Sequence, residues 1–365
     1  MAKNEDKYAP LGGQAVIEGV MMRSLKKIAV AVRNEGFKIT DNTLNDLKKE
    51  GISDQLIQDI SPLKNNKFLT GEEFEKELDK VNLSKEQKEL ILKSSYKNEI
   101  VTKIWDYIAL KDKSKIWGAP FIRGVIALVE SLYWGVKTLN YSASVVYEEE
   151  TDQQASPFWT GMSFFIGILL AIGIFMGIPG FVFITLKSYI QEVVLLNLIE
   201  GGVRVIIFIV YLYAIKLIPD VQRVFQYHGA EHKVIHANEM NEELIYENIK
   251  KHNPAHSRCG TSFLLITLLI SIVVFSLLGK SPTLLIRILS KLSLLPIVAA
   301  ISYELIRQAG KYDLLKQKDL WIKKFFVTFA YILTFPGLWL QKITTAEPDE
   351  KQVEVAVVAL KKAIE

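Results

Sequence analysis

The chain of 365 residues has a single cysteine, Cys259, and only five histidines. One cysteine cannot form an internal disulfide, which excludes a disulfide-stapled scaffold and is typical of a reducing compartment. The first residues, MAKNEDKYAPLGG, lack the apolar core of a secretory signal, so we expect the N-terminus to stay in the cytosol. The net charge of +4 is small for this length and predicts no specific nucleic-acid binding.

Apolar and charged residues occupy different parts of the chain, although 50% of the residues are hydrophobic and 23% are charged. Residues 1–120 and 342–365 are rich in Lys and Glu, whereas residues 158–340 contain several apolar runs of membrane-spanning length. The sequence therefore predicts a polytopic α-helical membrane protein with four or five membrane helices and a small cytosolic N-terminal domain that contains β-strands. The lipid bilayer is its first expected partner.

The cytosolic N-terminal domain is expected in residues 1–120. Within it, residues 11–40 alternate apolar and polar positions between glycines, which predicts a small sheet with a hairpin turn at residues 34–36. Residues 41–103 change to charged helical segments without a sustained hydrophobic face, and we interpret them as a helical insertion. Residues 121–147 fit an amphipathic helix at the bilayer interface and a core helix of the domain equally well.

Two membrane helices are expected in residues 158–218, and two or three more in residues 262–341. The stretch 325–340 is sixteen residues long, so it predicts either a short span or a re-entrant segment. Glu200 and Arg204 lie one helical turn apart in the second span. Because an unpaired charge inside a span is costly, we expect these two side chains to pair with each other.

Loop charge predicts the orientation of the chain in the membrane. The loop 310–324 carries five lysines, and the positive-inside rule places it in the cytosol. With a cytosolic N-terminus, two crossings return residues 219–261 to the same side, and residues 342–365 form a cytosolic C-terminal helix. The N-terminal domain can then cover residues 219–261.

All five histidines and the cysteine lie within the stretch from His228 to Cys259. His228 and His232 are four residues apart, hence on one face of a helix, and His256 and Cys259 form a second compact pair. Two pairs of nitrogen and sulfur donors are what a tetrahedral zinc ion selects, so zinc is the predicted cofactor. His236 continues the series and is the reserve ligand.

The stretch from His228 to His232 also reads H-x-x-E-H, the pattern of the inverted zincins, in which a glutamate acts on the zinc-bound water. Glu231 is then the candidate general base, and Arg258 is the candidate for steadying an anionic group. Four protein donors would close the coordination sphere and make the zinc structural, whereas three donors and a water would make it catalytic.

The N-terminal segment GGQAVIEG offers two further polar side chains, Gln14 and Glu18. They are four residues apart on an expected strand, so both point to the same face. Because this strand and the histidines are expected on the same side of the membrane, we predict that Glu18 accepts the free N–H of an imidazole of His228 or His232. The alternative is a tight turn and an ordinary edge strand.

Several segments together resemble the YqhQ family of bacterial membrane proteins: GGQAVIEGVMMRS, PFIRG with ALVES, YHGAEHK, RCGTSF, ISYE, PGLWLQ and TTAEPDEKQVEVA, in this order. The family has no established function and is generally labelled a predicted metal-dependent enzyme. The resemblance implies a place in the bacterial cytoplasmic membrane, and it carries over to His228, Glu231, His232, His256, Arg258, Cys259, Gln14 and Glu18. Ser257 stands where the family usually has a proline, and residues 41–103 have no counterpart in it.

These residues lead to three hypotheses about function. The first is a membrane-embedded, metal-dependent hydrolase that acts on a lipid-linked or membrane-bound substrate at the cytosolic interface. The second is a non-enzymatic membrane-protein biogenesis factor, in which zinc pins a loop and the Lys-rich cytosolic surface contacts the ribosome or the translocation machinery. The third is a transporter, suggested by Glu200, Arg204 and Glu304 within the spans.

Overall fold

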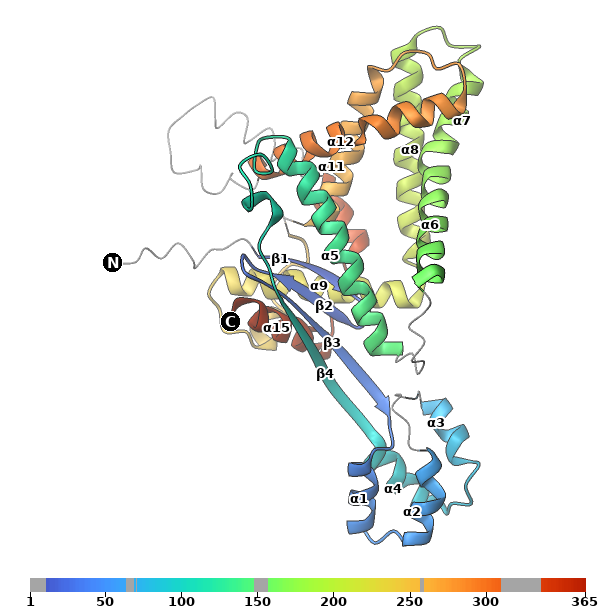
Figure 1. The fold of residues 1–365 in the computed structure, drawn as a ribbon, viewed down its shortest axis with the longest axis vertical. Coiled ribbons are helices and arrows are strands. Elements are labelled where there is room, and N and C mark those ends of the chain that lie inside the picture. Colours follow the sequence, from blue (N-terminus) through green and yellow to red (C-terminus); the bar gives the residue numbers. More distant parts are fainter. Residues whose placement is uncertain (1–10, 64–68, 70, 148–156, 257–258, 310–335) are drawn as a thin grey trace, which may run out of the picture.

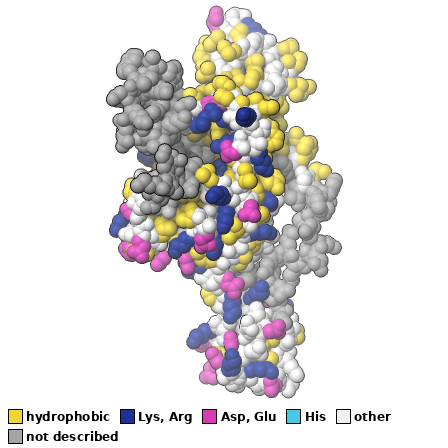
Figure 2. Space-filling view, turned by 60° about the vertical axis from the view of Figure 1, so that its left-hand side comes forward, with side chains coloured by type: hydrophobic (Ala, Val, Ile, Leu, Met, Phe, Trp, Pro, Cys, Tyr) yellow, Lys and Arg dark blue, Asp and Glu magenta, His cyan; other side chains and the backbone are white. Residues whose placement is uncertain are grey.

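The computed structural model describes residues 11–63, 69, 71–147, 157–256, 259–309 and 336–365. The protein is mostly helical and has a small antiparallel sheet near its N-terminus, as the sequence predicts. Figure 1 shows apolar helices at one end, the sheet in the middle and a small group of helices at the other end. In Figure 2, hydrophobic side chains gather over the end with the apolar helices, whereas charged side chains are densest around the sheet and beyond it.

The sheet has four antiparallel strands in the order β1-β2-β3-β4, namely β1 (Gly12–Val16), β2 (Gly19–Arg23), β3 (Lys27–Phe37) and β4 (Tyr96–Asp106). A two-residue turn joins β1 to β2, because Val16 pairs directly with Gly19. Glu18 lies in this turn with a positive φ of 48°. The expected turn at residues 34–36 is wrong, since β3 runs through them and pairs there with β4. β4 is separated from β3 by a long segment of the chain, so no local sequence pattern predicts that the two strands pair.

Both faces of the sheet are covered by helices. One face of β2 and β3 packs on α9 (Pro219–Glu239) and on the C-terminal helix α15 (Glu350–Ile364). The opposite face packs on α5 (Ile122–Tyr147), whose Trp134 and Tyr141 contact it. Alternating apolar residues on both faces explain why β3 is almost wholly buried. The sheet therefore fixes α9 beside the N-terminal strands.

The insertion between β3 and β4 consists of α1 (Asp41–Lys49), α2 (Asp54–Ile60), α3 (Gly71–Leu78) and α4 (Lys85–Ser95). The sequence predicts no sustained hydrophobic face for these helices, yet together they form a core of their own, which includes Leu47, Ile60 and Phe74. Their apolar positions are spread thinly over four short helices, so no single helix shows a long stripe. The insertion also ends earlier than residue 103, because residues 96–106 form β4.

Helix α5 combines features of both interpretations of residues 121–147. One side packs on the sheet, and its N-terminal part packs on α12 (Leu284–Ala309), where Gly124 lies against Ala300. Arg123 and Glu304 form an ion pair of 2.5 Å at this contact. Other apolar side chains of α5 stay exposed, for example Val129, Leu132 and Tyr133. Its location at a bilayer interface remains a prediction.

Three helical stretches are long and apolar enough to cross a membrane: Gly161–Leu186, Val193–Ile215 and Leu284–Arg307. The first combines α6 (Pro157–Ile172), the π-helical turn η4 (Gly173–Gly177) and α7 (Ile178–Leu186), the second is α8 (Val193–Ile215), and the third lies within α12. The apolar helix α11 (Gly260–Ser276) has only 17 residues. Most of the expected stretch 325–340 lies outside the described residues, and residues 336–344 are helical. Four or five spans therefore remain a prediction.

A charged cluster is buried between the apolar helices α8 and α12. Arg287 donates from Nε to a carboxylate oxygen of Glu200 at 3.0 Å, and Lys291 donates to the other oxygen of the same carboxylate. Arg204 lies 3.8 Å from Glu200 and donates to the carbonyl of Phe175 at 3.1 Å. The expected pairing of Glu200 with Arg204 is thus part of a larger cluster that we call the bundle cluster: Glu200, Arg204, Arg287 and Lys291.

Candidate metal centre

Helix α9 presents three histidines on one face. It begins directly after the apolar helix α8, with Pro219 in its first turn, where a missing N–H costs nothing. His228, His232 and His236 follow at intervals of four residues, so their side chains lie above one another. The opposite side of the helix packs on β1, β2 and α15. The histidine face is therefore turned toward the segment that leads into α11.

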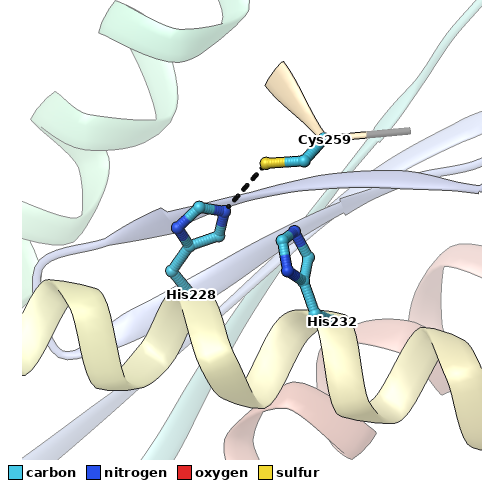
Figure 3. A group of neighbouring side chains, drawn as sticks. All are labelled: His228, His232 and Cys259. Atoms are coloured by element: carbon cyan, nitrogen blue, oxygen red, sulfur yellow. Dashed lines mark hydrogen bonds between the residues drawn. The ribbon is translucent and has the colours of Figure 1, made fainter. Parts of the chain in front are cut away.

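Cys259 directly precedes α11 and lies opposite the histidine face of α9. It is the N-cap residue, and its Sγ accepts a hydrogen bond from the backbone N–H of Thr261 at 3.4 Å. Figure 3 shows His228 and His232 rising from α9 toward the Cys259 sulfur. The sulfur therefore lies at the N-terminal end of the apolar helix α11, next to the polar side chains of α9.

The donor atoms of His228, His232 and Cys259 all lie within 4.8 Å of one another, and His228 Nε2 is 3.2 Å from the Cys259 sulfur. The far ring nitrogens are held by main-chain carbonyls, His228 Nδ1 by Thr344 at 2.8 Å and His232 Nδ1 by Pro254 at 2.5 Å. A carbonyl can only accept, so each Nδ1 carries the proton and each Nε2 keeps its lone pair. This is how proteins orient imidazole ligands of a metal.

Burial and hydrogen bonding favour the protonation states that metal binding needs. Burial lowers the pKa of His232 below its ordinary value, which keeps the imidazole neutral. Burial alone would raise the pKa of the Cys259 thiol, but the neighbouring His232 and the hydrogen bonds from Thr261 lower it. A neutral imidazole and a thiol that ionises readily are the forms that bind zinc.

A second group lies further along α9, where donor atoms of His236, Glu239 and His256 also come within 4.8 Å of one another. His256 is therefore placed with His236 and Glu239, and not with Cys259 as the expected four-donor site required. The rings of His256 and His236 are 4.6 Å apart between centroids, against 5.7 Å for His256 and His232. The reserve ligand His236 thus belongs to this second group. We call the two sets the Cys259 group and the Glu239 group.

Glu239 was missed by sequence reasoning, although a signal was present. It lies three residues after His236, a spacing that brings two side chains of a helix together. No sequence pattern indicates that Thr344 and Gln341 position the histidines, because both lie far from the histidines along the chain. Gln341 grips the backbone of His256, accepting its N–H at 2.7 Å and donating to its carbonyl at 2.9 Å.

Glu231 is buried between α9 and β1. A side chain at Gly13 would collide with its carboxyl group, since an added Cβ would lie 2.6 Å from Glu231 Cδ. Glu231 Oε2 has no hydrogen-bond partner among the described residues. Burial raises the pKa of Glu231 to about 8, and His228 and Cys259 are close enough for their charges to act on it. The candidate base is therefore next to the Cys259 group.

Glu18 and Gln14 take other places than the sequence predicted. Glu18 accepts hydrogen bonds from Nε and Nη2 of Arg223 and from the hydroxyl of Tyr227. The free N–H groups of His228 and His232 are instead donated to main-chain carbonyls. Gln14 lies on β1 against Gly135 of α5, while Glu18 lies in the following turn, so the two do not share one strand face. The glutamate instead ties the β1–β2 turn to the first half of α9.

Two other residues belong to the histidine window, the name that we give to the stretch from His228 to Cys259. Arg258, the candidate anion-binding residue, lies outside the described residues. His252 belongs to neither donor group of the described residues, and its Nε2 pairs with Glu242 at 2.9 Å.

Comparisons with known proteins give a family and no activity. The family described as "Protein of unknown function (DUF1385)" matches residues 119–365, which include every histidine and the cysteine. The "Uncharacterized protein YqhQ" of Bacillus subtilis (strain 168) is 34% identical over 251 residues, which is 65% of this chain and 74% of that protein. No solved structure matches the chain. The extent of both sequence matches shows that this protein belongs to the YqhQ family.

Proposed function

We propose that this protein is a zinc-dependent hydrolase embedded in the bacterial cytoplasmic membrane, acting on a membrane-bound substrate at the cytosolic interface. The observation that carries the proposal is the Cys259 group. Its three donors converge from α9 and α11, and two of them already have their tautomers fixed by carbonyls. Three protein donors leave a coordination position open, which distinguishes catalytic from structural zinc sites.

The position of the Cys259 group supports an interfacial substrate. Helix α9 starts four residues after the apolar helix α8 ends at Ile215, and Cys259 directly precedes the apolar helix α11. Both sides of the group are therefore anchored at ends of apolar helices. A substrate held in the bilayer by an acyl chain would present its polar part at this depth.

A zinc ion in the Cys259 group would polarise a bound water and an electrophilic centre of the substrate. Glu231 is the residue of this chain placed to take and return a proton. Its burial holds the carboxyl neutral in the metal-free protein, and a nearby cation favours the carboxylate form that a general base requires. The packing of Gly13 against Glu231 keeps the carboxyl beside α9.

Two variants test this assignment. The wild-type protein, purified in detergent, should contain zinc, and Cys259→Ser should lose the zinc of the Cys259 group together with hydrolysis of phospholipid or lipid-linked phosphate substrates. Glu231→Gln should retain zinc and lose hydrolysis, because it keeps the shape and removes the base. Full zinc retention without Cys259, or full activity without the Glu231 carboxylate, would contradict the proposal.

A second candidate function, a membrane-protein biogenesis factor with a structural zinc, is favoured by the burial of the donors. His232 is 2% exposed and Cys259 is 8% exposed, which fits an ion that holds a loop in place. The same variants separate the two functions. For the second, Cys259→Ser loses the zinc of the Cys259 group and loosens residues 250–256, whereas Glu231→Gln changes neither. The membrane extract then binds ribosomes or translocation components in a zinc-dependent way.

A further inference from the structure

The Glu239 group has the geometry of a metal site of its own. His236 and Glu239 project from neighbouring turns at the C-terminal end of α9, and His256 reaches them from the facing loop. His256 Nε2 lies 3.5 Å from Glu239 Oε2. Ligand atoms around one tetrahedral zinc lie about 3 to 4 Å apart, so a small closure of this group would accommodate an ion.

Two of the three donors are held in place by contacts other than those within the group. His236 Nε2 donates to the carbonyl of Ala255 at 3.0 Å, so Nδ1 keeps the lone pair that a metal requires. The backbone of His256 is gripped on both sides by the buried amide of Gln341. The successive carbonyls of Pro254 and Ala255 thus orient His232 and His236, one histidine for each donor group.

A neighbouring pair shows what an ordinary histidine–glutamate contact looks like in this window. His252 and Glu242 are 2.9 Å apart, a normal hydrogen-bond length, and the pair lies outside both donor groups of the described residues. In the Glu239 group the nitrogen and the carboxylate oxygen are 0.6 Å further apart, and a second imidazole faces both. The wider spacing and the third donor are what a shared cation needs.

One ion cannot use all six donors. The two groups follow each other along α9, and the ring of His256 is nearer to His236 than to His232. Each group offers three protein donors, which is the number found in zinc sites that keep an open position. The Glu239 group has two imidazoles and a carboxylate, a set without sulfur that suits zinc and other first-row divalent ions.

We infer that the protein binds a second divalent transition-metal ion, held by His236, Glu239 and His256 beside the Cys259 group. The second ion gives the loop 254–256 a fixed position against α9. It also places a further positive charge next to any anionic substrate of the first site. This inference does not depend on hydrolysis, only on the juxtaposition of α9 and the loop.

Metal content and cobalt spectroscopy test the second ion on the full-length protein in detergent. We expect about two zinc ions per chain in the wild type, falling to about one in Glu239→Gln and in His236→Gln, because each removes one of three donors. The matched control Glu243→Gln, an exposed glutamate just beyond α9, should keep about two, since the same charge is lost without a donor.

Cobalt substitution identifies which ion is lost, because only the Cys259 group contains a thiolate. The thiolate-to-cobalt charge-transfer band should persist in Glu239→Gln and vanish in Cys259→Ser, which should retain one cobalt. One ion per chain in the wild type, with the band present, overturns the second site and leaves the zinc site of the proposed function intact. Loss of the band in Glu239→Gln also overturns it, because the two groups would then share one ion.

Discussion

Among the described residues, the bundle cluster and the donor groups of the histidine window are both largely buried, and they compensate for the loss of solvent in different ways. The bundle cluster gathers full charges, and a single carboxylate, Glu200, receives donors from Arg287 and Lys291 with Arg204 close by. The histidine window gathers imidazoles instead, and carbonyls accept the N–H groups of His228, His232 and His236 while the other ring nitrogens keep their lone pairs. The paired charges of the bundle cluster hold α8 and α12 together. The imidazoles, oriented by carbonyls, keep ring nitrogens that can still bind a metal ion.

The bundle cluster should be the more sensitive of the two to loss of a single group. In Glu200→Gln, three buried cations lose their carboxylate, and breaking buried pairs of this kind costs about 3 to 5 kcal/mol. We expect a large fall in the thermal unfolding temperature in detergent, measured by fluorescence. Glu192→Gln, an exposed residue at the start of α8, should leave that temperature unchanged. Equal effects of the two changes would show that the bundle cluster does not stabilise the helices.

The histidine window should instead respond to pH. The pKa of Glu231 is about 8 in the folded chain against 4.5 for the ordinary group, so the folded state binds the proton more tightly. In metal-free protein this stabilisation is complete below about pH 4.5 and is lost as the pH rises to about 8. We expect the unfolding temperature to fall across this interval, and to fall much less in Glu231→Gln.

The matching experiment adds zinc. A bound cation next to Glu231 favours its ionised form, so the slope with pH should become shallower in the zinc-loaded protein. A slope that is the same for wild type and Glu231→Gln would place the titrating group elsewhere.

A smaller effect is expected from Gln341, whose side chain holds the backbone of His256 and also donates to the Ser262 hydroxyl at 2.9 Å. Gln341→Ala frees the loop 254–256, and loss of such a supporting contact typically lowers metal affinity about 10- to 100-fold. Competition with a zinc chelator measures this loss. Lys342→Ala, the exposed neighbour, is the control. An unchanged affinity in Gln341→Ala would mean that the loop is held by the donors alone.

The smallest effect should come from the insertion, which has its own core and lies far from both clusters (Figure 1). Phe37 pairs with Tyr96 at the base of the insertion, so residues 38–95 can be replaced by a short hairpin loop without cutting β4. Zinc content and the unfolding temperature of the remainder should stay as in the wild type. A shortened chain that no longer inserts into membranes or binds zinc would show that the insertion is required for both.

The sequence predicts those parts of the molecule that depend on nearby residues. The apolar runs predict the long helices, and the spacing of His228 and His232 predicts a shared face, because both are properties of one helix. The turn predicted at residues 34–36 is wrong. These residues can form either a turn or part of a strand, and the outcome depends on whether another strand pairs with them. That partner, β4, follows the insertion.

The donor groups show the same limit. The donor group to which His256 belongs depends on where Gln341 holds its backbone, and no spacing within the histidine window contains that information. Glu18 was expected at the histidines because the predicted topology puts both on the same side of the membrane. Arg223, also on α9, is the stronger partner for a carboxylate, since its guanidinium can bind both oxygens at once.

The contacts of Thr344 with His228 and of Gln341 with His256 have a consequence for how the protein matures. A chain emerging from the ribosome carries all its histidines and its cysteine long before these two residues appear. Helix α15, which closes the core around β2, β3 and α9, is made later still. Until these C-terminal elements have been made, His228 and His256 lack the partners that orient them. The two donor groups therefore reach their final geometry only after the C-terminal part of the chain has folded against α9.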